Sequence, residues 1–231
     1  MDLKNLQNKI GFSFENEDFL KEALTHRSYL NEKSDWPFRN NERLEFLGDA
    51  VLELSVTDDL FHDFPKKEEG ELTVYRAALV NSKMLSRVAR EVGLTEEILT
   101  SKGEFTEISV GGGETILGDG LEALIGALYL DSGYEVARKF VRLFIMKHLE
   151  EVVKNGGKDA KSSVQEIAQD KYSLTPTYKV IDERGLAHQR IFKVGLYFGG
   201  ELKSTGTGNS KQSAELQAAE LLMNKLKSDI F

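Results

Sequence analysis

The stretch Asn41-Glu42-Arg43-Leu44-Glu45-Phe46-Leu47-Gly48-Asp49-Ala50-Val51-Leu52 is typical of an amphipathic helix, because its apolar residues recur every three or four positions. Its three acids stand at i, i+3 and i+7 and lie within a stripe of about 60°. The other side, expected to pack into the core, carries Leu44, Leu47, Val51 and Leu54. Like charges at this spacing destabilise an isolated helix by a few tenths of a kcal/mol per pair. A bound cation would offset that cost.

A second pair of acids, Asp119 and Glu122, stands at i and i+3 in a segment that then becomes strongly apolar. Acids on an otherwise buried helix are costly unless they are paired or bound to a metal. Carboxylates from two helices can surround a hard cation such as Mg²⁺. Each acid group, taken alone, is also compatible with a solvated helix face.

The helical spacing extends through the first two thirds of the chain, in segments 17–30, 41–62, 70–92, 115–131 and 133–153. Residues 1–153 are therefore predicted to form an all-α domain, and 154–159, with two glycines, a linker. Beyond it the pattern predicts a helix from about 163 to 172, strands over 177–181, 190–198 and 201–206, and a helix over 210–227. On the middle strand Phe192, Val194, Leu196 and Phe198 share one face. Residues 160–228 thus indicate a small α+β domain of order α-β-β-β-α.

Composition limits the function classes. The 231 residues include no cysteine, which excludes disulfides and thiolate zinc sites. The N-terminus lacks the apolar run of a signal peptide, and no segment approaches the roughly 20 apolar residues of a membrane span. A cytoplasmic protein without membrane contact is expected. Residues 1–157 hold 19 Lys and Arg against 29 Asp and Glu, a net charge of −10, whereas 158–231 hold 11 against 9, a net of +2. The acidic and mildly basic parts are expected to have different tasks.

Wider motifs identify a family. Residues 41–52 resemble the signature segment of ribonuclease III, the endonuclease of double-stranded RNA. His26-Arg27-Ser28-Tyr29, Glu69–Thr73 with Arg76-Ala77, and Asp119–Asp131 resemble its other motifs, and 160–228 resemble a double-stranded RNA-binding domain. The resemblance covers nearly the whole chain.

The resemblance implies a Mg²⁺-dependent enzyme, with Mn²⁺ as an alternative ion, that acts as a homodimer. It would leave 5′-phosphate and 3′-hydroxyl ends and process ribosomal precursor and some messenger RNAs. The metal-binding residues it implies are Glu45, Asp49, Asp119 and Glu122. Asp49 and Glu122 would be the most essential to catalysis, Glu42 and Glu69 would have supporting roles, and Phe46 would enter the partner subunit. Hydrolysis would use a water activated by the cation.

The same resemblance assigns the RNA contacts. A domain of this type touches two minor grooves and the phosphates between them. The implied contact residues are Gln165 and Glu166 on the first helix, His188 in the first strand loop, and Ser210 and Lys211 at the start of the last helix. Gln212 stands where a second lysine is usual and Leu186 where a proline is usual, so weaker binding is expected.

Two other function classes stay open at this point. A non-cleaving double-stranded RNA-binding protein would use the helical domain only as a dimer platform, but such a protein would be expected to lose some of the four carboxylates. A metal-dependent phosphohydrolase of small nucleotides would leave the second domain without a purpose.

Overall fold

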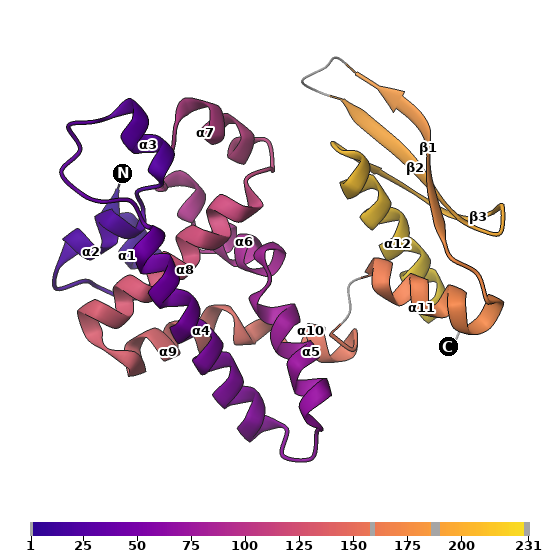
Figure 1. Cartoon of the computed structure of the whole chain (residues 1–231), viewed down its shortest axis with the longest axis horizontal. Helices are drawn as coiled ribbons and strands as arrows, with labels where there is room; N and C mark the ends of the chain where they lie inside the picture. Colours follow the sequence, from indigo (N-terminus) through magenta and orange to yellow (C-terminus); the bar gives the residue numbers. More distant parts are fainter. Residues whose placement is uncertain (1, 158–159, 186–189, 229–231) are drawn as a thin grey trace. The chain divides into compact units, whose positions relative to one another are not determined.

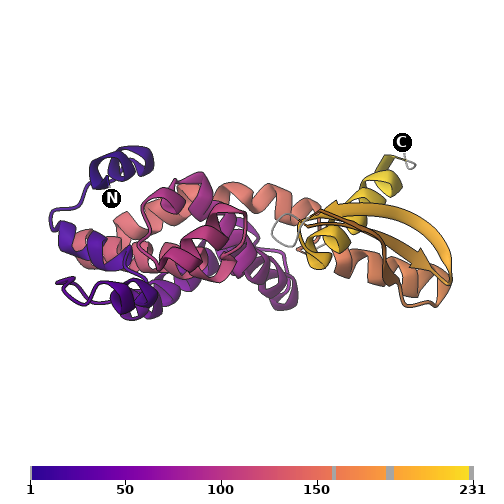
Figure 2. The same cartoon turned by 90° about the horizontal axis from the view of Figure 1, so that it is seen from above.

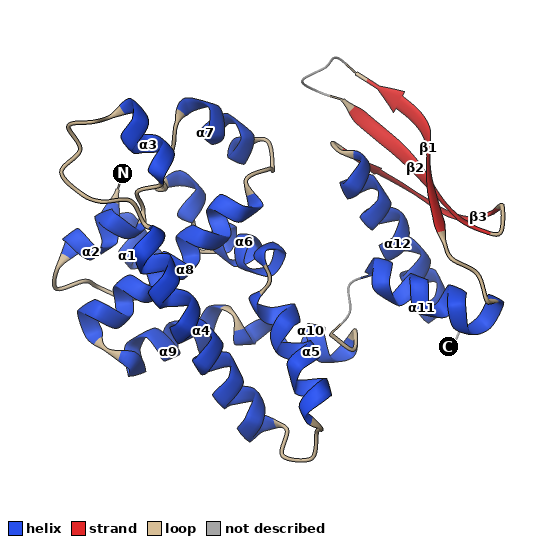
Figure 3. Ribbon diagram, in the orientation of Figure 1, coloured by secondary structure: helices blue, strands red, loops and turns tan. Residues whose placement is uncertain are grey.

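The chain divides into two compact units, Met1–Gly157 and Lys158–Phe231. The computed structural model describes residues 2–157, 160–185 and 190–228, with backbone alone for 227 and 228. Within those ranges helices make up the regular structure of the first unit, and the strands are confined to the second, as Figure 3 shows. The fold class predicted from the sequence, a helical domain followed by an α+β domain, is confirmed.

The first unit contains ten α-helices and two 3₁₀ turns within its described residues: α1 (Leu3–Ile10), α2 (Glu17–Ala23), α3 (Arg27–Glu32), α4 (Glu42–Asp63), α5 (Glu69–Val80), α6 (Ser82–Glu91), η1 (Leu94–Glu96), α7 (Lys102–Ser109), α8 (Glu114–Ser132), α9 (Tyr134–Phe144), η2 (Met146–His148) and α10 (Leu149–Lys154). The long helix α8 packs against α4, α6, α9 and α2 (Figure 1). Its middle is buried on all sides, which explains the near-continuous apolar run after Glu122.

The helix boundaries differ from the sequence prediction at two breaks. Segment 17–30 is interrupted after α2, because Thr25 forms a bridge with Leu99 and the backbone N–H of His26 donates to the Leu99 carbonyl at 2.9 Å. Segment 70–92 is interrupted at Asn81, whose side-chain oxygen accepts from Met84 N at 2.9 Å and so begins α6. Helices α1 and α7 lie outside the predicted segments.

The buried face of α4 also differs from the prediction. Leu44 and Val51 are buried, but Leu47 is only half-buried and Leu54 is 57% exposed. The helix instead buries Gly48, Leu52 and Val56, because α4 packs closely against α8 at Gly48. Leu54 falls on the opposite side, which carries further exposed apolar residues.

The second unit comprises α11 (Ala160–Tyr172), β1 (Thr177–Arg184), β2 (Ile191–Phe198), β3 (Glu201–Gly208) and α12 (Lys211–Ser228). The strands form one antiparallel sheet of order β1-β2-β3. Both helices lie on the same face of this sheet (Figures 1 and 2). Val194, Leu196 and Phe198 are buried beneath them and Phe192 is half-buried, as the alternation of β2 predicts.

Candidate functional site

Two glycines bring α4 and α8 into close contact. A Cβ atom built on Gly48 would overlap the carbonyl oxygen of Glu122, and one built on Gly126 would lie 2.3 Å from the carbonyl oxygen of Leu44. Both obstacles are backbone atoms, which cannot turn aside as a side chain can. The crossing therefore requires glycine at both positions. It places the first turns of α4 directly beside the middle of α8.

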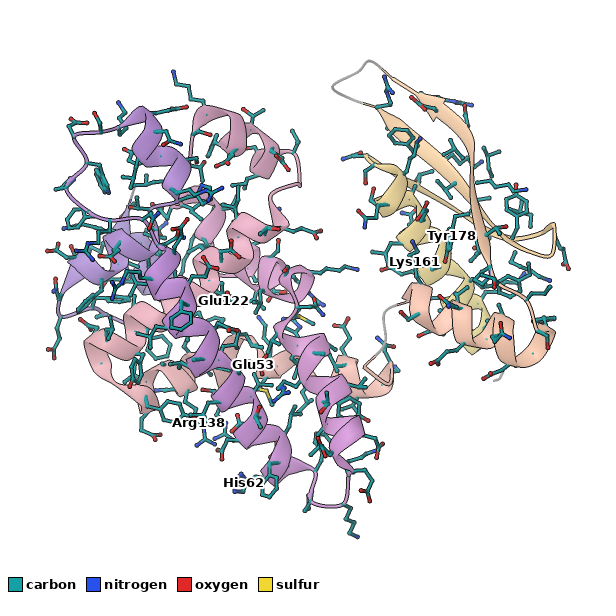
Figure 4. All side chains as sticks on the ribbon, in the orientation of Figure 1. Glu53, His62, Glu122, Arg138, Lys161 and Tyr178 are labelled. Carbon is teal, nitrogen blue, oxygen red and sulfur yellow. The ribbon has the colours of Figure 1, made fainter. Side chains whose placement is uncertain are left out.

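Three of the four predicted metal ligands meet at this crossing. Glu45 of α4 and Asp119 and Glu122 of α8 each offer a carboxylate oxygen, and these oxygens all lie within 4.8 Å of one another. All three side chains are half-buried. In Figure 4 the labelled Glu122 lies where the two helices cross. These three residues are referred to below as the carboxylate group.

The carboxylate group concentrates uncompensated negative charge. Burial, and then the charges of Asp49, Asp119, Glu45 and Glu53, raise the pKa of Glu122 to about 8. Burial and the neighbouring carboxylates likewise raise the pKa of Glu45. Within the described part of the chain no Lys, Arg or His side chain forms an ion pair with Glu122. The buried carboxylate of Asp59 contrasts with it, because Arg138 and Arg142 pair with that group at 2.7 and 2.9 Å.

Two further predicted acids, Asp49 and Glu42, lie outside the carboxylate group. Asp49 is exposed and stands outside the three-residue cluster, yet its charge contributes to the raised pKa of Glu122. Glu42 is exposed, faces Arg27 at 3.6 Å and contributes to the raised pKa of Glu45.

Glu69 is not brought to the group. Helix α5, which it begins, is joined to the middle of α4, because Arg76 contacts Glu53 at 3.1 Å and Thr57 at 3.1 Å. Glu69 precedes Arg76 by two helical turns and follows the short loop after the C-terminal end of α4, whereas Glu45 lies in the first turn of α4.

Sequence reasoning gave no role to two further residues near the group. Burial raises the pKa of Asp119, and the electrostatic effect of the His26 imidazole lowers it. Glu104 lies 2.9 Å from His26 Nδ1, although 78 residues separate them in sequence. No periodicity signals such a contact. The motif 26–29 contained one partner, and the capping pattern Ser101-x-x-Glu104 contained the other.

The predicted RNA-binding residues of the second unit lie on two helices where they are described. Gln165 and Glu166 are exposed on α11. Ser210 caps α12 by accepting from Ser213 N at 3.1 Å, and Lys211 follows as the exposed first residue of that helix. His188 and the departure at Leu186 lie outside the described residues.

Two further glycines fix where α12 begins. Cβ atoms at Gly206 or Gly208 would overlap atoms of α12, including the backbone of Ala214. The hydroxyl of Ser204 also donates to the Ala218 carbonyl at 2.6 Å. These contacts hold α12 against β3, so its N-terminal N–H groups and Lys211 are presented from a fixed position. A helix N-terminus beside a lysine is suited to phosphate.

Comparison with known proteins assigns both units. Residues 16–149 match the family model described as Ribonuclease-III-like, and residues 160–226 match the double-stranded RNA binding motif. Ribonuclease 3 of Borreliella afzelii is 42% identical over 230 residues, covering 97% of this chain and 91% of the relative. Ribonuclease 3 of a Geobacillus species, strain WCH70, is also 42% identical, with the same coverage.

A solved structure supports the fold of the first unit. The nuclease domain of ribonuclease III from Campylobacter jejuni, described as structurally flexible in a region involved in dimer formation, aligns with a TM-score of 0.57 and 41% identity. The alignment covers 63% of this chain and 96% of that domain. Among the described residues, no helix is both long enough and apolar enough to cross a membrane.

Proposed function

We infer the mode of action from one premise: the chain belongs to the ribonuclease III family and is an endonuclease of double-stranded RNA. The first unit matches the nuclease and the second the RNA-binding motif, so cutting and holding the duplex are assigned to separate units. We propose that the carboxylate group, with Asp49, binds Mg²⁺ for this reaction, with Mn²⁺ as an alternative ion.

The residues of the group fit a hard divalent cation. Mg²⁺ takes oxygen ligands, and the group offers three carboxylate oxygens within 4.8 Å. Burial and the neighbouring carboxylates raise the pKa of Glu122 to about 8, so a cation at the group would favour its ionised form. When bound, the cation would offset that charge and supply a water of lowered pKa for phosphodiester hydrolysis. This convergence of acids is the observation that carries the proposal.

Each carboxylate then has a defined task. Glu122 holds a proton on its carboxyl near neutral pH and must release it on ligation, so metal binding is favoured as pH rises. Asp49 and Glu122 are proposed as the residues most essential to catalysis. Glu42 acts through its charge on Glu45. Glu69 lies apart from the group, at the start of α5, and its supporting role is proposed on the family resemblance alone.

An apolar stripe on α4 supports a homodimer. Phe46 is 81% exposed, Leu54 57% and Phe61 67%. At about 100° per residue these side chains lie within about 80° of one another around the helix. Such a stripe on a helix surface favours a partner. We propose that it packs on a second copy of the chain and that Phe46 enters the partner subunit. The nuclease domain of the Campylobacter jejuni relative has a region involved in dimer formation, which supports a dimer of this chain.

The second unit is proposed to hold the duplex through α11, His188 and the N-terminus of α12. Gln165 and Glu166 would meet one minor groove, and Ser210 and Lys211 the phosphates. The products are proposed to carry 5′-phosphate and 3′-hydroxyl ends, with ribosomal precursor and some messenger RNAs as substrates in the cytoplasm. Membership of the family supports the products and substrates, and the absence of cysteine fits a reducing compartment.

The test is incubation of the protein with a long RNA duplex and Mg²⁺. Wild type should release short duplexes with 5′-phosphate ends, and Glu122→Gln should bind the duplex without cutting it. Glu114→Gln changes an exposed acid of the same helix outside the group and should cut normally. If wild type only retards the duplex in a gel, the protein binds RNA without cleaving it.

A further inference from the structure

Three consecutive glycines, Gly111, Gly112 and Gly113, lie in the turn that joins α7 to α8. Gly111 and Gly113 have positive φ angles of 97° and 69°, which glycine adopts more readily than other residues. The turn folds back on α7, because a Cβ atom on Gly113 would lie 2.4 Å from Ile108 Cγ1. Glycine loses more conformational freedom on folding than any other residue, so this turn depends on contacts that hold it.

The side chain of Arg90 supplies such contacts from α6. Its Nη2 donates to the carbonyl of Gly112 at 2.6 Å, and its Nη1 donates to the carbonyl of Ile108 at 3.3 Å. The Ile108 carbonyl belongs to the last turn of α7, where a cation is favourable. The half-buried guanidinium of Arg90 therefore fastens the glycine turn to the end of α7.

The glycine turn determines how α8 begins. Its last residue, Gly113, is the N-cap of α8, has no side chain to cap the helix, and accepts from Leu117 N at 3.0 Å through its carbonyl. Asp119 follows in the second turn of α8, between Gly118 and Gly120, which add no side-chain packing beside it. The backbone hydrogen bonds thus lead from Arg90 through the turn to the part of α8 that carries a residue of the carboxylate group.

We propose that Arg90 is a positioning residue of the metal centre, which fixes the glycine turn so that the second turn of α8 presents Asp119 to the cation. The proposal rests on the proposed function, because it requires a cation at the carboxylate group. The simpler alternative is that Leu117 and Leu121, both fully buried, hold α8 in place without help from the turn.

The sign of the effect separates positioning from a direct action of charge. Removal of a positive charge near the carboxylate group would by itself strengthen the binding of a cation. Loss of positioning weakens it, so Arg90→Gln sets the two effects against each other. Arg87→Gln is the matched control, because it removes the same charge one turn earlier on α6. Arg87 contacts Glu91 at 3.2 Å and Glu151 at 3.0 Å instead of the glycine turn.

The test is Mn²⁺ binding to the full-length protein, followed by the loss of the free Mn²⁺ signal in electron paramagnetic resonance. Arg90→Gln should weaken binding about 10-fold, the lower end of what the loss of an outer support costs a metal site. Arg90→Lys should weaken it by a smaller factor, because lysine can donate to a carbonyl but lacks the planar fork that reaches two. Arg87→Gln should bind Mn²⁺ at least as tightly as wild type.

Amide hydrogen exchange reports the start of α8 without any metal. The Leu117 N–H, which donates to the Gly113 carbonyl, should exchange faster in Arg90→Gln than in wild type, and the amides of α9 should be unchanged. Unchanged α9 amides also show that the variant is folded. Either Mn²⁺ affinity or Leu117 exchange equal to wild type in a folded Arg90→Gln overturns the proposal.

A double variant tests whether the effect passes through Asp119. In an Asp119→Asn background, Arg90→Gln should weaken Mn²⁺ binding by much less than 10-fold, because the carboxylate that it positions is already lost. An undiminished effect there also overturns the proposal. If Arg90→Gln does not fold, Arg90→Lys decides in its place by the same criteria. If Glu122→Gln binds Mn²⁺ as wild type does, the metal centre itself is refuted.

Discussion

The crossing of α4 and α8 makes Gly126→Ala the most informative substitution. The new Cβ would lie 2.3 Å from the Leu44 carbonyl oxygen, whereas a carbon approaches a carbonyl oxygen to about 3.3 Å. The helices must therefore separate by about 1 Å. Glu45 is the residue after Leu44, so it would move away from Asp119 and Glu122 together with the start of α4, by a similar distance. A shift of about 1 Å at a reacting centre can cost about 100-fold in rate.

The effect on stability should be much smaller than the effect on cleavage. Overpacking costs about 1–3 kcal/mol, and alanine returns about 1 kcal/mol of helix propensity. A net loss of about 0–2 kcal/mol lowers the melting temperature by up to about 8 °C. We expect a folded variant whose single-turnover cleavage rate constant is reduced about 100-fold and whose Mn²⁺ binding, measured by paramagnetic titration, is weaker.

The matched control for this prediction is Gly118→Ala on the same helix. A Cβ there meets its nearest neighbours, atoms of Leu85 and Ser82, at 3.7 Å, an ordinary contact distance. This variant should cut at the wild-type rate and melt slightly higher. Wild-type cleavage and Mn²⁺ affinity in a stably folded Gly126→Ala would refute the reasoning, because the carboxylate group would then not depend on the close crossing.

Three further predictions concern charge, assembly and RNA. Without metal, the free energy of unfolding should fall as pH rises from about 4.5 to about 8, because folded Glu122 binds its proton more tightly than the unfolded chain does. Urea titrations in EDTA at several pH values should show a weaker dependence of the unfolding free energy on pH for Glu122→Gln, and an equal dependence would contradict this. Phe46→Glu should give the 25.9 kDa monomer by light scattering, while Phe105→Glu, 50% exposed on α7, should stay dimeric; a dimeric Phe46→Glu removes the α4 stripe as the interface. Gln212→Lys should steepen the salt dependence of duplex binding by about one phosphate contact, and Lys211→Ala should flatten it by the same amount. The measurement is the slope of log affinity against log salt concentration, and unchanged slopes would place α12 away from the phosphates.

Local sequence patterns predicted much of the fold because they are set by neighbouring residues. The helical spacing located α4 and α8, and the alternation on β2 located its buried face. The break at Asn81 and the start of α7 at Ser101 also had local signals, since both side chains cap the helix that follows. The split at Leu24–His26 had none, because its cause is pairing with Leu99, a residue distant in the chain.

The site was predictable to the same extent. The acid spacing pointed to Glu45, Asp119 and Glu122, but the close approach of the two helices at Gly48 and Gly126 was not predicted. The rotation of α4 about its axis was not predictable. Leu47 and Leu54 follow the apolar period, but because α4 packs on α8 through Gly48, Leu47 is only half-buried and Leu54 is exposed. The link from His26 to Glu104 depends on the folded chain alone.

The 22 residues of α4 form one uninterrupted helix that carries both the acid of the carboxylate group and the apolar stripe. Glu45 and Phe46 are adjacent in sequence, so the angle between the two surfaces is set by the helical phase and by nothing else. One residue inserted between Asp49 and Leu54 would rotate the rest of the stripe by about 100° relative to the acids. Among functional relatives, insertions and deletions should therefore be excluded from residues 45–61 and tolerated in the loop of residues 33–40. In this helix, a change of length would disturb the site more than a change of most exposed side chains.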